Sequence, residues 1–389
     1  MLFKGRVRSG IALLIFSLIL YAGEGGARNE RDKSPHYQIW GYYPYWMKDE
    51  WRKIDLGLFN QVLFFDVPVS GEGRNLHAID WPGKWQQLIV AAKKSGTRLQ
   101  PTFTLFDAKE FERIFSDPNQ RELLQADMLA MVQQAGSSGL QLDVEIFSAV
   151  SVTSSTGFRL FLKSIKRGLA AKKKALSLFV LSEDRAGLYD RKSLLIPDYI
   201  VIQGYDAHWK ESPKAGPVAQ LDGSMAASWE SSLNYFLSLG VPRHKIMMSV
   251  PFFGYEWPTA SDAVGALTRG AGSEISFAPL PIDLVPAVKA SAVERIRQYG
   301  SRRDPATGSP YYVYRDETGW FQGWFEDEVS LSAKFEFIKK QRLAGVAVFS
   351  LGYDAGNFQD LLRSHFRPPH SRKAPSNSGN SYSGPAQGR

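Results

Sequence analysis

The sequence predicts an α/β protein, a (β/α)8 TIM barrel with a small α+β insertion between its seventh and eighth strands. Short runs of β-branched and aromatic residues recur eight times, and stretches with helical spacing of apolar residues lie between most of them. Such alternation is typical of parallel sheets. Because no Gly-rich phosphate-binding turn follows the first run, a closed barrel is favoured over an open dinucleotide-binding sheet.

The eight runs give the expected strands. They are YQIWGYY (37–43), QVLFFDVPV (61–69), TRLQPTF (97–103), LQLDVE (140–145), ALSLFVL (175–181), DYIVIQGYD (198–206), KIMMSVPFFG (245–254) and GVAVFSLG (345–352). Helices are expected between them over 81–96, 119–136, 155–173, 224–240 and 330–345. The barrel is therefore expected to comprise residues 36–256 and 326–366.

The interval between the seventh and eighth runs is too long for one helix. Residues 257–325 begin with a Gly- and Pro-rich segment, and they contain a helix candidate, SAVERIRQYG, and two aromatic runs separated by DETG. Turn residues between alternating aromatic residues predict a hairpin. We therefore expect an inserted α+β subdomain over 257–325. Residues 367–389, rich in Ser, Gly, Pro and Arg, are expected to form a disordered basic tail.

The first 27 residues have the pattern of a secretory signal. Lys4, Arg6 and Arg8 precede the apolar stretch IALLIFSLILYA, and GGA supplies small residues for cleavage after Ala27. An uncleaved membrane anchor is the alternative, but the stretch is shorter than the roughly 20 residues of a spanning helix. Under either interpretation we expect export, to the periplasm, the cell envelope or the extracellular space, and no stable membrane span after cleavage.

Composition excludes several kinds of chemistry. The chain has no cysteine, so it can have no disulfide, thiolate zinc site or cysteine nucleophile. The formal net charge is +8, and +6 remains once residues 1–27 are removed, which favours anionic surfaces or polymers as partners. Nucleic acid fits an exported chain poorly, and the basic residues are scattered or confined to helix faces such as 163–174. No cofactor is implied, and a monomer is expected.

Two acids stand inside the apolar fourth run, in SSGLQLDVEIF (137–147). Residues two apart in a strand face the same way, so Gln141, Asp143 and Glu145 share one side, which in a barrel is the lumen. Glu145 falls at the C-terminal end of the strand, where barrel enzymes place their chemistry. Burial there raises the pKa of a carboxyl and keeps it protonated near neutrality, as a general acid requires. Ion pairing with Lys or Arg of neighbouring strands is the structural alternative.

Other predicted strand ends also carry polar and aromatic residues. The sixth run ends in Tyr205 and Asp206, and the Tyr205 phenol can donate a hydrogen bond to a developing charge. Flat aromatic faces at a polar rim suit the apolar faces of sugar rings, although any single aromatic residue can instead belong to the core. The aromatic candidates are Tyr42, Trp46, Trp209, Tyr255 and Trp257.

These motifs resemble those of glycoside hydrolase family 18, the chitinase and endo-N-acetylglucosaminidase family. SGLQLDVE is similar to the family's Asp-Gly-x-Asp-x-Asp-x-Glu signature, with Glu145 on the acid position and Asp143 on the assisting position. GYYPYW (41–46) resembles the first strand of its bacterial spore-germination and cell-wall branch, and GYDAHW (204–209) resembles its Tyr-Asp motif. VPFFGYEW, WFEDEVSLSAKFEF and GVAVFSLG resemble its last barrel segments, so the resemblance covers roughly residues 38–360.

The resemblance implies an exported enzyme that cleaves β-linked N-acetylglucosamine-containing glycans, namely peptidoglycan, an exopolysaccharide or chitin, by substrate-assisted retaining hydrolysis. It implies that Glu145 protonates the leaving oxygen and then activates water, and that Asp143 orients the acetamide nitrogen. Tyr205 is expected to hydrogen-bond the acetamide oxygen, and Asp206 to line the subsite. No metal is needed.

The chain departs from the family signature at several positions. Ser138 and Gln141 replace its first two aspartates, and Phe349 replaces a tryptophan that floors the sugar subsite. Gln141 is still expected beside the substrate, and its amide, if it faces Asp143, is expected to lower the pKa of that carboxyl.

These departures keep a second hypothesis open, a sugar-binding barrel of the lectin type with weak or lost catalysis. The replacement at Gln141 favours it, whereas retention of all three catalytic candidates opposes it. A metal-dependent polysaccharide deacetylase ranks last, because the six histidines show no ligand spacing.

Overall fold

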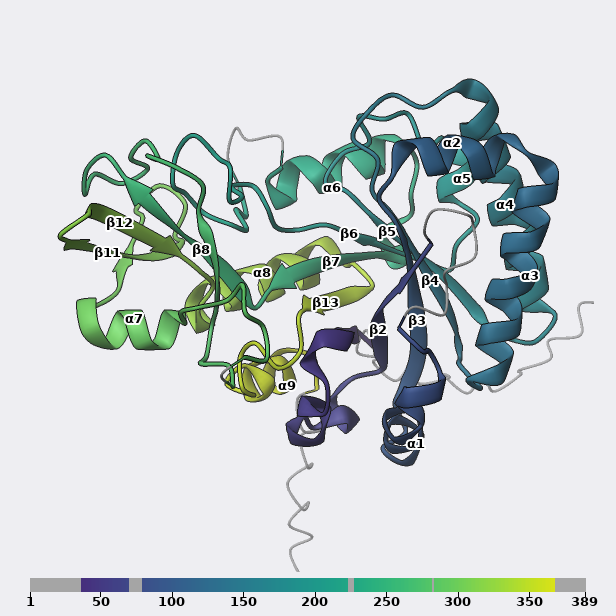
Figure 1. The fold of residues 1–389 in the computed structure, drawn as a ribbon, viewed down its shortest axis with the longest axis horizontal. Helices are drawn as coiled ribbons and strands as arrows, with labels where there is room; N and C mark the ends of the chain where they lie inside the picture. Colours follow the sequence, from purple (N-terminus) through teal and green to yellow (C-terminus); the bar gives the residue numbers. More distant parts are fainter. Residues whose placement is uncertain (1–35, 70–78, 223–226, 282, 368–389) are drawn as a thin grey trace, which may run out of the picture. The chain divides into compact units, whose positions relative to one another are not determined.

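The structure, a computed structural model, describes four stretches of the chain (Figure 1): residues 36–69, 79–222, 227–281 and 283–367. Every element below belongs to one compact unit, which begins at Tyr37. The expected signal segment, 1–27, lies outside the described residues, as does all of the expected tail after Arg367. Within the described stretches, no helix is long and apolar enough to cross a membrane.

Eight parallel strands close into a barrel, which confirms the predicted fold class. Neighbours around the barrel are neighbours in chain order, and β1 pairs with β13 to close it. The barrel strands are β1 (Gln38–Pro44), β2 (Gln61–Pro68), β3 (Arg98–Leu105), β4 (Gly139–Val144), β5 (Ala175–Val180), β6 (Tyr199–Ile202), β7 (Ile246–Pro251) and β13 (Gly345–Phe349).

Helices lie between successive strands of the barrel and after the last one. They are α1 (Gln86–Lys94), α2 (Ala108–Ser116), α3 (Pro118–Gln134), α4 (Val152–Ala170), α5 (Arg191–Leu194), α6 (Trp229–Ser238), α8 (Glu328–Gln341) and α9 (Gln359–Phe366). Short 3-10 helices add η1 (Tyr45–Met47), η2 (Glu50–Lys53), η3 (Leu56–Leu58), η4 (Gly83–Trp85) and η5 (Arg243–Lys245). Neither α2 nor α9 was expected from the sequence, because each has only two turns or so in which to show an apolar period.

Alternation along β4 separates a polar lumen from an apolar outer side. Gln141 and Asp143 share the lumen side, where the hydroxyl of Thr102 on β3 donates to Gln141 Oε1 at 3.3 Å. Leu140 and Leu142 point the other way and belong to the main apolar core. The outer side of β4 therefore buries its apolar side chains in the core, and its polar side chains point into the lumen.

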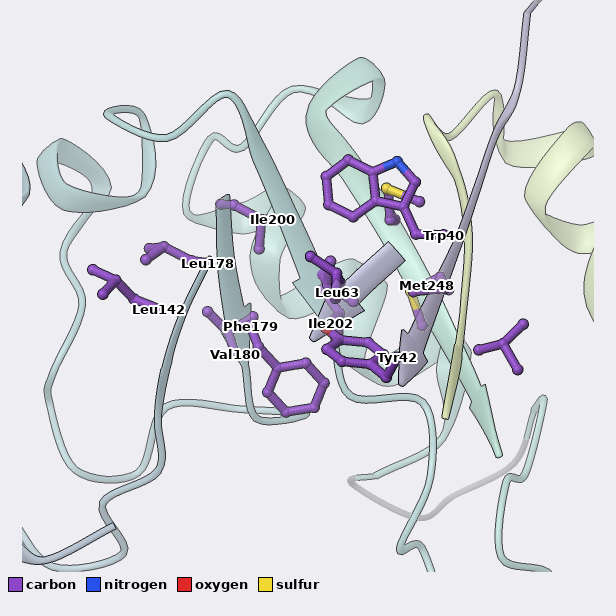
Figure 2. Packing of buried hydrophobic residues seen from close by; sticks show 14 of the residues in the cluster. Trp40, Tyr42, Leu63, Leu142, Leu178, Phe179, Val180, Ile200, Ile202 and Met248 are labelled. Carbon is purple, nitrogen blue, oxygen red and sulfur yellow. The ribbon is translucent and has the colours of Figure 1, made fainter. Parts of the chain in front are cut away.

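Large side chains fill the rest of the barrel core (Figure 2). Trp40 and Tyr42 of β1 lie among aliphatic side chains from other strands of the barrel, including Ile202 of β6 and Met248 of β7. The Trp40 ring meets that of Tyr199 edge to face, with 5.0 Å between ring centroids. This packing closes the interior below the polar groups of β4.

Strand β6 is shorter than the predicted 198–206 and ends at Ile202. A Cβ at position 204 would lie 2.1 Å from the Ser249 carbonyl oxygen, so glycine is required where the two backbones approach. Asp206 then adopts a φ of 63°, a conformation that Asp tolerates better than most residues. Tyr205 and Asp206 therefore lie in a loop beyond the strand.

The predicted insertion contains a second, antiparallel sheet in the order β10-β11-β12-β8-β9. The expected hairpin is its β11–β12 pair, and α7 packs on β11. The elements are β8 (Phe253–Thr259), β9 (Ser273–Ser276), α7 (Ala292–Tyr299), β10 (Arg302–Arg303), β11 (Pro310–Asp316) and β12 (Gly319–Trp324).

The predicted run 245–254 holds parts of two strands rather than one. β7 ends at Pro251, which has no N–H to continue a ladder, and β8 begins at Phe253. The second sheet thus begins four residues before the predicted insertion boundary at 257. The barrel passes almost directly into the insertion at this point.

Replacing Gly157 by alanine should destabilise the fold by about 1–3 kcal/mol, because α4 packs too closely on the end of α2 for a side chain there. A Cβ at position 157 would lie 1.8 Å from the Phe115 carbonyl oxygen, whereas one at Gly168, in the same helix, meets only the movable end of Leu129. Urea unfolding of Gly157→Ala, with Gly168→Ala as the matched control, measures the difference. Equal stability of the two variants would contradict this packing.

Candidate active site

A cavity of about 250 Å³ lies at the C-terminal end of the barrel strands. Barrel enzymes carry their chemistry at this end. Strand ends, the loop after β6 and the first two strands of the insertion all contribute to the wall. The lining residues are Tyr42, Phe65, Phe106, Asp143, Glu145, Phe179, Gln203, Tyr205, Asp206, Phe253, Tyr255, Glu274 and Phe349.

The two acids of the fourth run meet in this cavity. β4 ends at Val144, but the backbone N–H of Glu145 still donates to the Leu105 carbonyl oxygen at 3.1 Å. This bond continues the register with β3, so the Glu145 side chain points to the same side as that of Asp143. The two carboxyl groups hydrogen-bond to each other.

Burial raises the pKa of both carboxyl groups. It raises the pKa of Glu145 to about 7, with a further upward contribution from the charge of Asp206, while the hydrogen bond with Asp143 acts downward. Burial also raises the pKa of Asp143 well above its usual range, followed by the charges of Glu145 and Asp66. Both shifts favour a state near neutral pH in which the hydrogen-bonded pair keeps a shared proton.

Asp206 forms a second acidic point of the cavity. Its two oxygens accept hydrogen bonds from the Tyr255 hydroxyl and the Gln203 amide, each at 3.1 Å. Burial raises its pKa to about 6, and the bond from Tyr255 opposes that rise. Because Tyr255 belongs to β8, this bond joins the loop after β6 to the insertion.

Aromatic rings form the apolar part of the cavity wall. The Phe349 ring lies 5.7 Å from that of Tyr42, 5.9 Å from that of Tyr205 and 5.3 Å from that of Phe65, measured between centroids. Burial raises the pKa of Tyr42 and of Tyr205 well above the usual value, so both phenols stay protonated and can donate hydrogen bonds.

One acceptor in the cavity is left for a ligand. Asp143 is only 3% exposed, and its Oδ1 has no hydrogen-bond partner among the described residues. Leaving such an atom unpaired costs roughly 1–3 kcal/mol. A bound group that donates an N–H or O–H at this point would recover that free energy.

Most of the predicted site residues thus lie together, although their individual roles remain predictions. Three predicted aromatic residues do not line the cavity. Trp257 is fully buried, and its indole N–H donates to the backbone carbonyls of Trp209 and Lys210. Trp46 donates to the Tyr353 hydroxyl at 3.2 Å, and Trp209 is half exposed outside the lining. Trp257 lies on the same side of β8 as Tyr255, with 5.6 Å between the ring centroids, but two residues farther along the strand, where it has a structural position.

The structure places Gln141 differently from what the sequence led us to expect, and its contact with the substrate stays a prediction. Its side chain is fully buried below the cavity and does not line it. Its Oε1 accepts from Thr102, and its Nε2, the atom that could donate to Asp143, has no hydrogen-bond partner among the described residues. The pKa of Asp143 is raised rather than lowered, because burial and neighbouring negative charges act on it.

Glu274 is a cavity residue that the sequence analysis missed. It lies on β9 opposite Tyr255, and burial raises its pKa to about 7. The Tyr353 hydroxyl bonds its carboxyl and also accepts from the Trp46 indole N–H at 3.2 Å. No motif surrounds Glu274, so only the pairing of β9 with β8 reveals its place.

Asp66, also missed, is an acid near the end of β2. The hydroxyl of Thr104 on β3 donates to its Oδ2, and its charge contributes to the raised pKa of Asp143. It stands in the run VLFFDV, an isolated acid among apolar residues. An acid inside an apolar run was the signal that marked Asp143, and the same signal would have identified Asp66. Among the described residues, no group of three or more His, Asp or Glu side chains is arranged to hold a metal ion.

Comparison with protein families identifies residues 38–354 as matching the glycosyl hydrolases of family 18. The cortical fragment-lytic enzyme of Bacillus cereus is 25% identical over 260 residues, which cover 64% of this chain and 54% of that relative. The enzyme of the same name from Bacillus anthracis is 28% identical over 163 residues, covering 40% of this chain and 32% of the relative. The chain thus spans about half or less of these relatives' lengths.

Solved structures share the fold. Catalytic domain 2 of the group II chitinase of Ostrinia furnacalis superposes with a TM-score of 0.72 at 19% identity, covering 86% of this chain and 97% of that one. The spore cortex-lytic enzyme SleL of Bacillus cereus superposes with a TM-score of 0.67 at 20% identity, covering 85% and 74%.

The raised pKa of Glu145 should appear in the pH dependence of stability. Between its ordinary value of 4.5 and about 7, the folded protein binds more protons at this carboxyl than the unfolded chain does, so stability falls as pH rises. Glu145→Gln removes that loss. Its unfolding free energy relative to wild type should increase by about 2–3 kcal/mol from pH 4 to pH 8.

Urea unfolding at both pH values measures this difference. Glu122→Gln, at an exposed position of α3, is the control and should show no such change. A pH-independent difference for Glu145→Gln would show that the carboxyl is not desolvated as described.

Proposed function

The chain belongs to glycosyl hydrolase family 18, a family of glycosidases, and we propose that it is an exported enzyme that cleaves β-linked N-acetylglucosamine-containing glycans by substrate-assisted retaining hydrolysis. The observation that carries the proposal is the carboxyl pair of β4. Glu145, with a pKa of about 7, sits in a cavity beside Asp143, which has an unpaired buried oxygen. An acid that keeps its proton near neutrality is what cleavage of a glycosidic bond requires.

The first half of the reaction breaks the glycosidic bond. Glu145 gives its proton to the bridging oxygen while the carbonyl oxygen of the sugar's own acetamide bonds to the anomeric carbon. Oδ1 of Asp143 accepts the acetamide N–H and stabilises the positive charge that develops on that group. The Tyr205 phenol donates to the acetamide oxygen and aligns it for attack.

The second half restores the enzyme and the acetamide. Glu145, now ionised, takes a proton from a water molecule as that water bonds to the anomeric carbon, and the bond from the acetamide oxygen breaks. Two displacements at the same carbon retain its configuration. Glu145 regains its proton, so no net proton is consumed.

The charge of the cavity limits which sugar it accepts. Its described lining holds four acids and no Lys, Arg or His. A sugar with a carboxylate would meet repulsion there, whereas a neutral N-acetylglucosamine unit would not. We therefore place N-acetylglucosamine at the cavity, whether the polymer is peptidoglycan, an exopolysaccharide or chitin. Names of relatives, such as cortical fragment-lytic enzyme, favour peptidoglycan.

Export is part of the proposal and rests on the N-terminal pattern. The stretch before Ala27 has the charge and apolar content of a secretory signal, and the +6 charge of the remainder suits an anionic cell envelope. We propose that the protein acts in the periplasm, at the envelope or outside the cell.

A sugar-binding barrel without catalysis is the second candidate. Gln141, which replaces a carboxylate of the family signature, is the observation that favours it. It predicts tight binding of N-acetylglucosamine oligomers with no new reducing ends. The retained acid pair at the cavity favours the enzyme.

Glu145→Gln should lower kcat by about 10²–10⁴-fold on N-acetylglucosamine oligomers while leaving their binding largely intact, because an amide cannot supply the proton. Reducing ends released from oligomers and from purified cell-wall sacculi measure turnover, and calorimetry measures binding. Glu183→Gln, which changes an acid in the loop after β5, is the matched control and should keep wild-type activity. Undiminished turnover by Glu145→Gln would exclude the assigned general acid.

Asp143→Asn should weaken the binding of an N-acetylglucosamine thiazoline by about 10–100-fold, because the variant loses a charge-assisted hydrogen bond. The thiazoline mimics the ring formed when the acetamide attacks the anomeric carbon. Competitive inhibition constants for wild type, Asp143→Asn and the Glu183→Gln control measure the effect. If the thiazoline does not inhibit the active wild-type enzyme, the nucleophile is not the acetamide.

A further inference from the structure

We propose that Asp66 is a positioning residue for the catalytic pair, a carboxylate supplied by β2 that keeps the shared proton on Asp143 and Glu145. Gln141 occupies the lumen-facing place before Asp143 on β4 and has no charge to offer. The proposal rests on the proposed glycosidase function and deepens it. It assigns to β2 a negative charge beside the catalytic pair, which the neutral Gln141 of β4 cannot supply.

A β-bulge brings Asp66 to the lumen. In the pairing of β2 with β3, Phe65 lies opposite Thr102 and Val67 lies opposite Phe103, so Asp66 is an extra residue without a partner. Phe65 lines the cavity, and Asp66, one residue later, accepts a hydrogen bond from Thr104. Strict alternation would have sent these two side chains to opposite sides of the strand.

Thr104 connects Asp66 to the catalytic pair in space. Thr104 and Asp143 lie opposite each other in the β3–β4 pairing. On β2 the residue paired with Thr104 is Pro68, so it is the hydrogen bond from the Thr104 hydroxyl that brings the Asp66 carboxylate to the level of Thr104 and Asp143. One level below, the hydroxyl of Thr102 donates to Gln141 in the same manner. Each threonine thus holds one polar group by a hydrogen bond, Thr102 the amide of Gln141 and Thr104 the carboxylate of Asp66.

The other groups that influence Asp143 give no cation to neutralise the pair. Those groups are Glu145 itself and the phenols of Tyr42 on β1, Tyr189 after β5 and Tyr205 beyond β6, together with Asp206, which acts on Glu145. β5 presents the apolar Phe179, and Thr104 of β3 is neutral. The negative charge of Asp66 therefore acts on Asp143 without a nearby positive charge, and it opposes loss of the shared proton.

This proton is the one that Glu145 gives to the glycosidic oxygen. Asp66 opposes the loss of this proton. The free enzyme therefore keeps its general acid protonated up to a higher pH. Burial raises the pKa of Asp66, and the hydrogen bond from the Thr104 hydroxyl opposes that rise and so favours the charged form of the carboxylate.

Asp66→Asn tests the inference because it removes the charge and keeps an oxygen for the Thr104 hydroxyl. The alkaline limb of the kcat/KM profile should move to lower pH by about half a unit to one unit. In Asp66→Asn/Gln141→Asp, a carboxylate on β4 should move the limb back toward the wild-type position. Glu183→Gln is the control and should leave the limb in place. A purely structural role for Asp66 predicts lower thermal stability with an unmoved limb, and that result would overturn the inference.

A second measurement does not depend on turnover. The side-chain carboxyl carbon of Glu145, labelled with ¹³C and identified by its loss in Glu145→Gln, should titrate at a lower pH in Asp66→Asn than in wild type. Equal midpoints would sink the inference even if the enzyme is active. Wild-type protein that releases no reducing ends at any pH would instead contradict the proposed function, while the carboxyl titration would still decide the role of Asp66.

Discussion

The structure depends on the burial of two carboxyl groups side by side at the end of β4. Taking one ionised carboxyl out of water costs several kcal/mol, and two like charges in contact cost more. Asp143 and Glu145 reduce this cost by sharing a proton, so the pair carries one charge instead of two. The same arrangement that makes the pair tolerable in the fold gives Glu145 a proton to donate. Stability and chemistry are therefore set by one interaction.

Elsewhere the chain neutralises its buried acids in a different way. Lys334 bonds Glu326 at 2.7 Å with both side chains buried, and Glu256 is held by Arg295 at 2.9 Å and by the Tyr312 hydroxyl at 2.6 Å. Each of these acids has a cation beside it. Asp143, Glu145 and Asp206 have no such partner, since the described lining offers phenols and an amide but no positive charge, while Glu274 interacts with the charge of Lys210 outside the lining. That contrast separates carboxyl groups with a structural role from those left free to exchange protons.

The barrel, its insertion and the acids of β4 were predictable because each leaves a local pattern. A period of two with acids on one side places Asp143 and Glu145 in the lumen once the barrel is assumed. The contacts of Gln141 were not predictable, because an amide bonds whichever neighbour the register supplies, and the pairing of β3 with β4 supplies Thr102. The bulge at Asp66 likewise follows from the pairing of β2 with β3, which no single run of residues reveals.

The insertion is part of the site, and the sequence boundary at 257 conceals this. β8 starts only two residues after β7 ends, so the rigid barrel positions its first residues. Two residues into β8, Tyr255 bonds Asp206 and pairs with Glu274 on β9. The carboxyl of Glu274 is bonded in turn by Tyr353, which follows the last barrel strand. A charge on Asp206 raises the pKa of both Glu145 and Glu274, so the protonation of Glu145, the proposed catalytic acid, is coupled to a sheet outside the barrel.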